Sequence, residues 1–154
     1  MYKYFTPKIV RRALNIWPPF WGAGISIAKI SSNFQEVSVI LKDRFWNRNA
    51  NRTQYGGSIF SMTDPVFSFM LMGILREEYF VWDKQSEIDF ISPGTTDLYA
   101  HFVISDEQLA EIKQATKEGE KHFPQFEVYI YDKKGKVVAR VNRTLYVRKK
   151  PQFR

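Results

Sequence analysis

The chain has 154 residues, the usual length of one domain with a hydrophobic core of its own. It contains no cysteine, which excludes disulfide bonds, a thiolate nucleophile and a cysteine-based metal site, and two histidines are too few for a histidine metal cluster. The net charge of +7 is concentrated at the ends, because residues 1–12 hold four basic side chains and residues 140–154 hold six, with no acidic residue in either range.

The first segments predict a short helix followed by two strands. Residues 6–16 have the pattern of an amphipathic helix that ends at Pro18-Pro19. Residues 23–31 and 35–42 alternate apolar and polar side chains at a period of two, which is typical of strands. We expect the aromatic segment 17–21 to anchor the first helix against the sheet, with shielding of an acyl chain or contact with a membrane as open alternatives.

The run from Asn49 to Asp64 carries the strongest functional signal. It places an amide seven residues before Gly56 and a carboxylate eight residues after it. Glycines let the backbone approach a ligand closely, and the free N–H groups of a helix that starts at Gly56 or Gly57 can polarise a carbonyl oxygen. Asp64, two turns further along, has the chemistry of a general base or a nucleophile, and partial burial would raise its pKa. Together these groups describe acyl transfer to water.

Asp64 also has a purely structural interpretation. Pro65 falls inside the predicted helix, where proline removes a hydrogen bond and tends to kink the axis. Asp64 can therefore be the N-cap of a helix whose first residue is Pro65. The helix itself is predicted over about residues 57–76, and it is apolar almost all round, which is typical of a buried helix.

The second half of the chain predicts four strands and one polar helix. The helix begins with a capping box in which Ser105 is the N-cap and Gln108 the third helical residue. The predicted elements are strands at 79–91 and 95–104, the helix at 106–117, and a hairpin of strands at 122–132 and 136–148. This order predicts an α+β fold in which an antiparallel sheet of about five to six strands wraps around one long buried helix.

Asn49, the pair Gly56-Gly57 and Asp64, at these intervals, resemble the pattern of the hotdog-fold thioesterases, particularly the phenylacetyl-CoA thioesterase type. The resemblance covers roughly residues 15–148, and the chain looks most like a poorly characterised, thioesterase-like branch of that superfamily. It implies a single hotdog domain over residues 1–154, with an N-terminal helical segment at 1–20 and a basic tail at 149–154. Two positions depart from the pattern: Tyr55 stands where many members have histidine, and Arg52 where they often have glycine.

The resemblance also implies roles for these residues. Asp64 of one subunit would activate water or attack the thioester, while the Gly56 N–H and the Asn49 side chain would hold its carbonyl oxygen. Ser68, one helical turn beyond Asp64, would position the water. The remaining candidates are the residues predicted to contact the substrate, which are Gly57, Tyr55, Phe67, Met70 and Leu71.

The function implied is hydrolysis of an acyl-CoA or acyl-carrier thioester, with coenzyme A only as part of the substrate and neither a metal nor another cofactor. The alternative is a non-catalytic module that binds acyl-CoA or a fatty acyl group. Open sheet edges and an apolar helix predict a homodimer, with pairing into a tetramer left open. We expect a cytoplasmic protein without an integral membrane segment or a nucleic-acid partner. The basic side chains near the C-terminus are candidates for phosphate binding or simply a solvated terminus; they are Arg140, Arg143, Arg148, Lys149 and Lys150.

Overall fold

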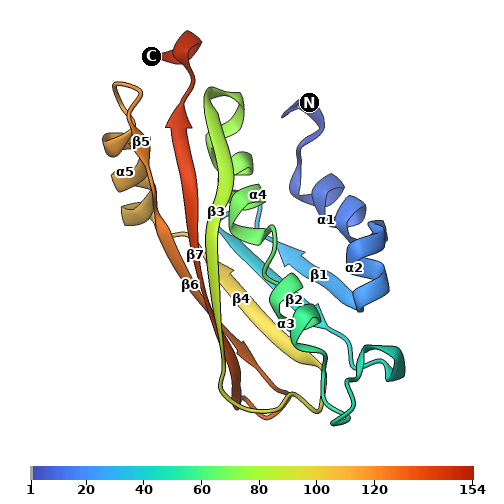
Figure 1. The fold of residues 1–154 in the computed structure, drawn as a ribbon. Helices are drawn as coiled ribbons and strands as arrows, with labels where there is room; N and C mark the ends of the chain where they lie inside the picture. Colours follow the sequence, from blue (N-terminus) through green and yellow to red (C-terminus); the bar gives the residue numbers. More distant parts are fainter. Residues whose placement is uncertain (1) are drawn as a thin grey trace.

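A computed structural model, which describes residues 2–154, contains one curved antiparallel sheet that wraps around a central helix (Figure 1). The helices are α1 (Pro7–Ile16), α2 (Pro18–Ala23), α3 (Gly56–Ser61), α4 (Val66–Leu75) and α5 (Asp106–Ala115). The strands are β1 (Ile25–Ile30), β2 (Glu36–Leu41), β3 (Tyr79–Phe90), β4 (Leu98–Val103), β5 (Lys121–His122), β6 (Gln125–Tyr131) and β7 (Val137–Lys149). The predicted α+β hotdog arrangement is confirmed.

Six strands form the continuous sheet in the order β1-β2-β4-β6-β7-β3, and the two-residue β5 pairs with β7 as a seventh. The predicted strand at 122–132 is split into β5 and β6 at Pro124, because proline has no N–H to donate to the ladder. β1 and β3 are the two edges. β3 is twelve residues long and most of its side chains are exposed, so a long strand edge is open on one side of the single chain.

The central helix is broken into α3 and α4. Residues 62–65 form a turn between them, since Pro65 cannot donate the hydrogen bond that a continuous helix requires. Pro65 is itself the N-cap residue of α4, and no side chain caps that helix. The interpretation of Asp64 as an N-cap is therefore wrong. The whole unit Gly56–Glu78 is long and apolar enough to span a membrane, but most of it is buried inside the molecule, as expected of a core helix.

The core lies between α4 and the concave face of the sheet. The Phe67 ring packs edge-on against Phe102, at 5.1 Å between centroids, and stacks on Phe126 at 4.7 Å. Met70 and Leu71 are fully buried beside it. These contacts explain why α4 is apolar on all sides, because it has sheet or helix neighbours all round.

The N-terminal segment packs against the edge strand β1. α1 ends at Ile16 as predicted, but a second helix, α2, which the sequence did not predict, begins at Pro18 with proline in its favoured first position. The Asn15 amide accepts a hydrogen bond from Ile27 N (2.6 Å) and donates one to Ile27 O (3.1 Å), so it occupies part of the β1 edge. At the other terminus, the expected basic tail starts later than predicted, because Lys149 still belongs to β7.

Candidate functional site

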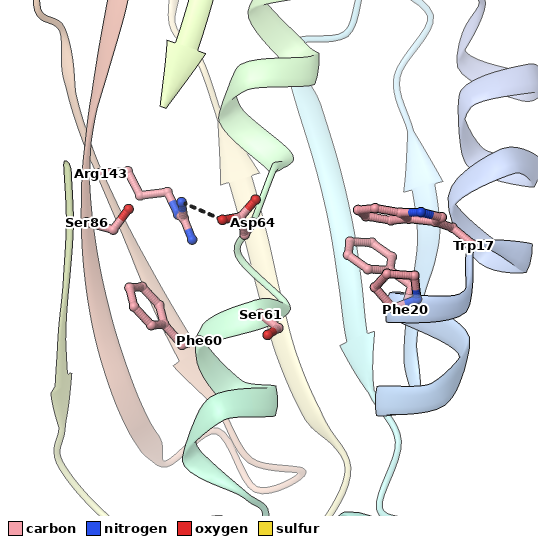
Figure 2. Close-up of a pocket in the computed structure, with 8 residues that line it drawn as sticks. Trp17, Phe20, Phe60, Ser61, Asp64, Ser86 and Arg143 are labelled. Carbon is pink, nitrogen blue, oxygen red and sulfur yellow. Dashed lines mark hydrogen bonds and ion pairs between the residues drawn. The ribbon is translucent and has the colours of Figure 1, made fainter. Parts of the chain in front are cut away.

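Two cavities lie beside the α3–α4 unit, and the candidate residues are divided between them. The first, of about 610 Å³, contains Asn49 and Gly56 and is called the donor cavity below; its other walls are Asn51, Thr53, Gln54, Ile59 and residues 90–94. The second, of about 430 Å³, contains Asp64 and is called the acid cavity; it is lined by Trp17, Pro19, Phe20, Phe60, Ser61, Asp64, Ser86 and Arg143 (Figure 2). Within one chain, then, Asn49 and Gly56 lie together and Asp64 lies apart from them.

The loop that carries Asn49 is organised by the side chain of Asn49 itself. Its Oδ1 accepts hydrogen bonds from Asn51 N (2.9 Å), Thr53 N (3.2 Å) and Thr53 Oγ1 (3.1 Å). The Nδ2 group has no hydrogen-bond partner among residues 2–154, so it is free to donate into the donor cavity. Arg52 in this loop has a φ of 60°, a left-handed conformation that glycine adopts more readily than other residues.

The glycine pair opens α3 with unpaired donors. Tyr55 O accepts from the N–H groups of Ser58 and Ile59, while the N–H groups of Gly56 and Gly57 have no acceptor among the described residues. A side chain at either position would displace an exposed aromatic ring. A Cβ on Gly56 would lie 3.0 Å from Phe90 Cζ, and a Cβ on Gly57 would overlap the ring of the exposed Tyr55. The donor cavity thus has the free N–H of Gly56 and the Asn49 amide in its wall, two donors of the kind that can bind a carbonyl oxygen.

Arg143, on β7, is the centre of the acid cavity's polar wall. Its side chain is only 2% exposed. Nη1 lies 3.1 Å from Asp83 Oδ1 and 3.4 Å from Asp64 Oδ2, and Nε and Nη2 both donate to Thr63 Oγ1 at 3.2 and 3.1 Å. The guanidinium also lies over the Phe60 ring, 5.4 Å from its centroid. This buried cation holds the turn between α3 and α4, and with it Asp64, in a fixed position against the sheet (Figure 2).

Asp64 and Ser68 differ in part from expectation. The Asp64 side chain is 59% exposed, so the partial burial that the sequence suggested is not found in the single chain. Ser68 is buried, and its hydroxyl lies 2.8 Å from both Pro65 O and Asp83 Oδ2. Ser68 therefore supports Asp83 and does not line the acid cavity. Two carboxylates share one guanidinium, which leaves the cluster with one excess negative charge.

The pattern of apolar residues along β7 marks Arg143 as a buried charge. Val141, Arg143, Leu145 and Val147 alternate along β7 at buried positions, so a charge stands in a row of core residues. A buried guanidinium requires a carboxylate partner, and Asp83 on the neighbouring strand provides it. Because Arg143 is buried and paired, its interpretation as a phosphate ligand is wrong.

Other predicted binding residues have structural contacts of their own. Arg140 pairs with Asp89 at 2.6 Å, and this hydrogen bond raises the pKa of Arg140, while Arg148 donates to Gly119 O at 2.8 Å. Phe67, Met70 and Leu71 lie in the core and line neither cavity. The apolar walls nearest Asp64 are instead aromatic side chains of α2, α3 and the residue before α2, namely Trp17, Phe20 and Phe60.

The fold resembles those of solved thioesterase-like structures. The protein PA5026 of Pseudomonas aeruginosa, described as of unknown function and a probable thioesterase, superposes with a TM-score of 0.83 at 16% identity over 93% of this chain and 95% of that one. Thioesterase HI1161 of Haemophilus influenzae gives 0.69 at 12% identity over 94% and 91%. The PaaI protein of the Escherichia coli phenylacetic acid degradation operon gives 0.61 at 15% identity over 92% and 90%. No curated protein matches the sequence significantly.

These likenesses show that the chain has the fold of thioesterase-like hotdog proteins. Residues 6–147 match the model of a domain of unknown function, DUF4442, and the chain belongs to that family.

Proposed function

We propose that the protein hydrolyses an acyl thioester, with coenzyme A or an acyl carrier as the leaving thiol. The observation that carries this proposal is the division of one α3–α4 unit into two half-sites, one with free N–H donors at Asn49 and Gly56 and one with the exposed carboxylate of Asp64. The donors stabilise the oxyanion that forms on the thioester carbonyl, and Asp64 activates water or attacks directly. The thiol leaves when the tetrahedral intermediate collapses.

A homodimer would join the two half-sites. The two cavities are separate within one chain, so Asp64 can serve the donor cavity only if a second copy carries it there. The open, exposed β3 edge supports such pairing, because edge-to-edge contact with the same strand of another copy would satisfy its free backbone groups. In this arrangement Gly57 and Tyr55 border the thioester. Association into a tetramer is compatible with the same dimer.

The substrate carries an uncharged acyl group. Trp17, Phe20 and Phe60 provide apolar walls beside Asp64, and the excess negative charge of the Asp64–Asp83–Arg143 cluster repels an acyl chain that ends in a carboxylate. Phe67, Met70 and Leu71 would contact the substrate only if its acyl chain is long enough to reach the core. Ser68 would act only indirectly, because it bonds to Asp83 and Asp83 shares Arg143 with Asp64. We infer a cytoplasmic location, since the chain has no cysteine and its one apolar helix is buried in the core.

The test is release of free thiol from a panel of short, long and aromatic acyl-CoAs, with dicarboxylic acyl-CoAs as poor substrates. Asp64→Asn should lower kcat by at least about a hundredfold, and Asn49→Ala by about ten- to a hundredfold. Asp89→Asn is the matched control, because Asp89 is also an exposed carboxylate paired with an arginine of β7. Its kcat should stay within about twofold of the native value.

The second candidate is an acyl-CoA binding module without hydrolysis, and the replacement of histidine by Tyr55 favours it. Calorimetric titration with a non-hydrolysable acyl-CoA analogue separates the two. Binding by the native protein without thiol release from any substrate establishes the module. Equal turnover by native protein and Asp64→Asn removes Asp64 from the reaction.

A further inference from the structure

The N-terminal third of the chain exposes several large apolar side chains, and two of them, Trp21 and Trp46, line the same surface cavity. They are called the N-terminal surface below and consist of Ile9, Ile16, Trp21, Phe45 and Trp46. Ile16, Trp21 and Phe45 are 78%, 73% and 84% exposed. α1 and α2 lie against β1, at the edge of the sheet opposite β3 (Figure 1). A dimer formed through β3 would therefore leave this surface free.

The packing of α1 against the sheet keeps Ile9 and Ile16 on its solvent side. At 100° per residue, Val10 and Leu14 face the sheet, so Ile9, Arg12 and Ile16 fall on the opposite side of α1. The two hydrogen bonds of Asn15 to Ile27 fix that rotation. α1 thus buries Val10 and Leu14 against the core and exposes Ile9 and Ile16 to solvent.

The aromatic side chains are fixed in the same way. Trp46 Nε1 donates to Gly22 O at 3.2 Å, and the Asn47 amide bonds to Ala23 O, which joins the loop after β2 to α2. Phe45 packs edge-on against Trp46, at 5.0 Å between centroids. Trp21, Phe45 and Trp46 remain mostly exposed among the described residues, and an exposed apolar cluster of this kind is typical of an interaction site.

The charge of the protein is concentrated in the same part of the chain. Residues 1–52 contain nine basic and two acidic residues, which account for the whole net charge of +7, and the remaining residues contain fourteen of each sign. Arg12 and Arg44 have no carboxylate partner among residues 2–154, and Arg44 lies 5.8 Å from the Trp46 ring centroid. Exposed aromatic and aliphatic side chains are therefore accompanied by unpaired cations.

We propose that the N-terminal surface docks the protein on an anionic lipid bilayer. Tryptophan and phenylalanine favour the depth of the headgroups, the two isoleucines enter the acyl region, and Arg12 and Arg44 contact lipid phosphates. A second copy of the same surface would bring like charges together. A nucleic acid would find rings to stack on, but Ile9 and Ile16 offer it neither a stacking face nor a hydrogen bond.

Docking would also place the acid cavity beside the lipid. α2 carries Trp21 on the outer surface, while Phe20 of the same helix and Trp17 just before it line the cavity (Figure 2). A lipid-soluble acyl chain would then have a short path from the bilayer into the protein. The docking itself does not depend on hydrolysis and can be tested without a substrate.

The experiment is co-sedimentation of the full chain with vesicles of phosphatidylcholine alone or with about one quarter phosphatidylglycerol, at low and raised salt. We expect at least about tenfold stronger partitioning to the anionic vesicles, weakened by salt. The double variant Trp21→Ser with Phe45→Ser should partition to the anionic vesicles at least about tenfold more weakly, because two large apolar side chains no longer leave water. Phe123→Ser, which changes an exposed aromatic residue between β5 and β6, is the control and should bind like the native protein.

Three outcomes would overturn the proposal. The first is that the native protein does not bind anionic vesicles. The second is that the double variant binds them as strongly as the native protein does. The third is binding to a single-stranded oligonucleotide in place of vesicles. Size-exclusion chromatography provides a further check, since an N-terminal surface that joins two copies would make the double variant smaller than the native assembly.

Discussion

At the scale of single residues, Arg143 is the side chain whose loss should be felt most. Replacing it with methionine leaves the partly buried Asp83 carboxylate without its cation, with only the Ser68 hydroxyl as a side-chain partner, and removes both N–H donors to Thr63 Oγ1. Breaking a buried ion pair by removing one member costs about 3–5 kcal/mol, and we expect about 2–4 here because the Asp83 side chain is 26% exposed. Urea unfolding measures the free energy directly.

Arg140, three residues earlier on the same strand, is the matched control for this prediction. It too pairs with an aspartate of β3, but its side chain lies in solvent, where an ion pair contributes little to stability. Arg140→Met should therefore unfold at nearly the native urea concentration. If both variants lose the same free energy of unfolding, the loss comes from replacing a residue of β7 in general and not from breaking the buried cluster.

A second residue-scale prediction concerns Asp43, which pairs with Arg48 just before the loop that carries Asn49. The hydrogen bond from Arg48 lowers the pKa of Asp43. A group whose pKa is lowered on folding stabilises the protein above its unfolded pKa of about 3.9, and this stability is lost as the pH falls through the folded value. Asp43→Asn should thus destabilise the protein at neutral pH, and the difference from native should shrink near pH 3. A difference independent of pH would assign the loss to packing.

At the scale of elements, α4 is placed against the β1–β2 hairpin by a glycine. A Cβ on Gly73 would overlap the ring of Phe34, which is itself buried. Gly73→Ala should cost about 1–3 kcal/mol, even though alanine favours a helix by about 1 kcal/mol over glycine. Thermal unfolding gives the size of the effect.

The control for Gly73 is another helical glycine, Gly22 in α2. A Cβ there has no atom within 4 Å, so Gly22→Ala should keep or raise the melting temperature. A loss of stability in the Gly22 variant would mean that helix geometry, and not the Phe34 contact, decides both results.

The elements also mark the limit of prediction from the sequence. Period-two and helical patterns were enough for the strands and for α5, because these depend on local order and on one buried face. The break between α3 and α4 and the start of α2 were harder, since each depends on where the chain turns around a proline. In the site, spacing pointed to Asn49, Gly56 and Asp64, whereas Asp83 joins Arg143 through pairing of distant strands, which a single sequence does not reveal.

At the scale of the whole molecule, the decisive question is whether one chain or two complete the proposed site. Asn49 and Asp64 line different cavities of one chain, and the proposed site takes them from different copies. An Asp64→Asn chain and an Asn49→Ala chain each lack one half of every site. A mixed dimer of the two has one site with both defects and one site with neither.

Mixing the two inactive variants should therefore restore thioester hydrolysis. With free exchange at equal amounts, half of the dimers are mixed and each has one intact site of two, so the activity should approach about a quarter of the native value. Native mass spectrometry of the mixture shows whether subunits exchange, because the mixed dimer has a mass of its own, and each variant alone gives the background. If exchange occurs and activity stays at that background, each chain carries its own complete site, and the two half-sites would have to meet through movement of the α3–α4 turn.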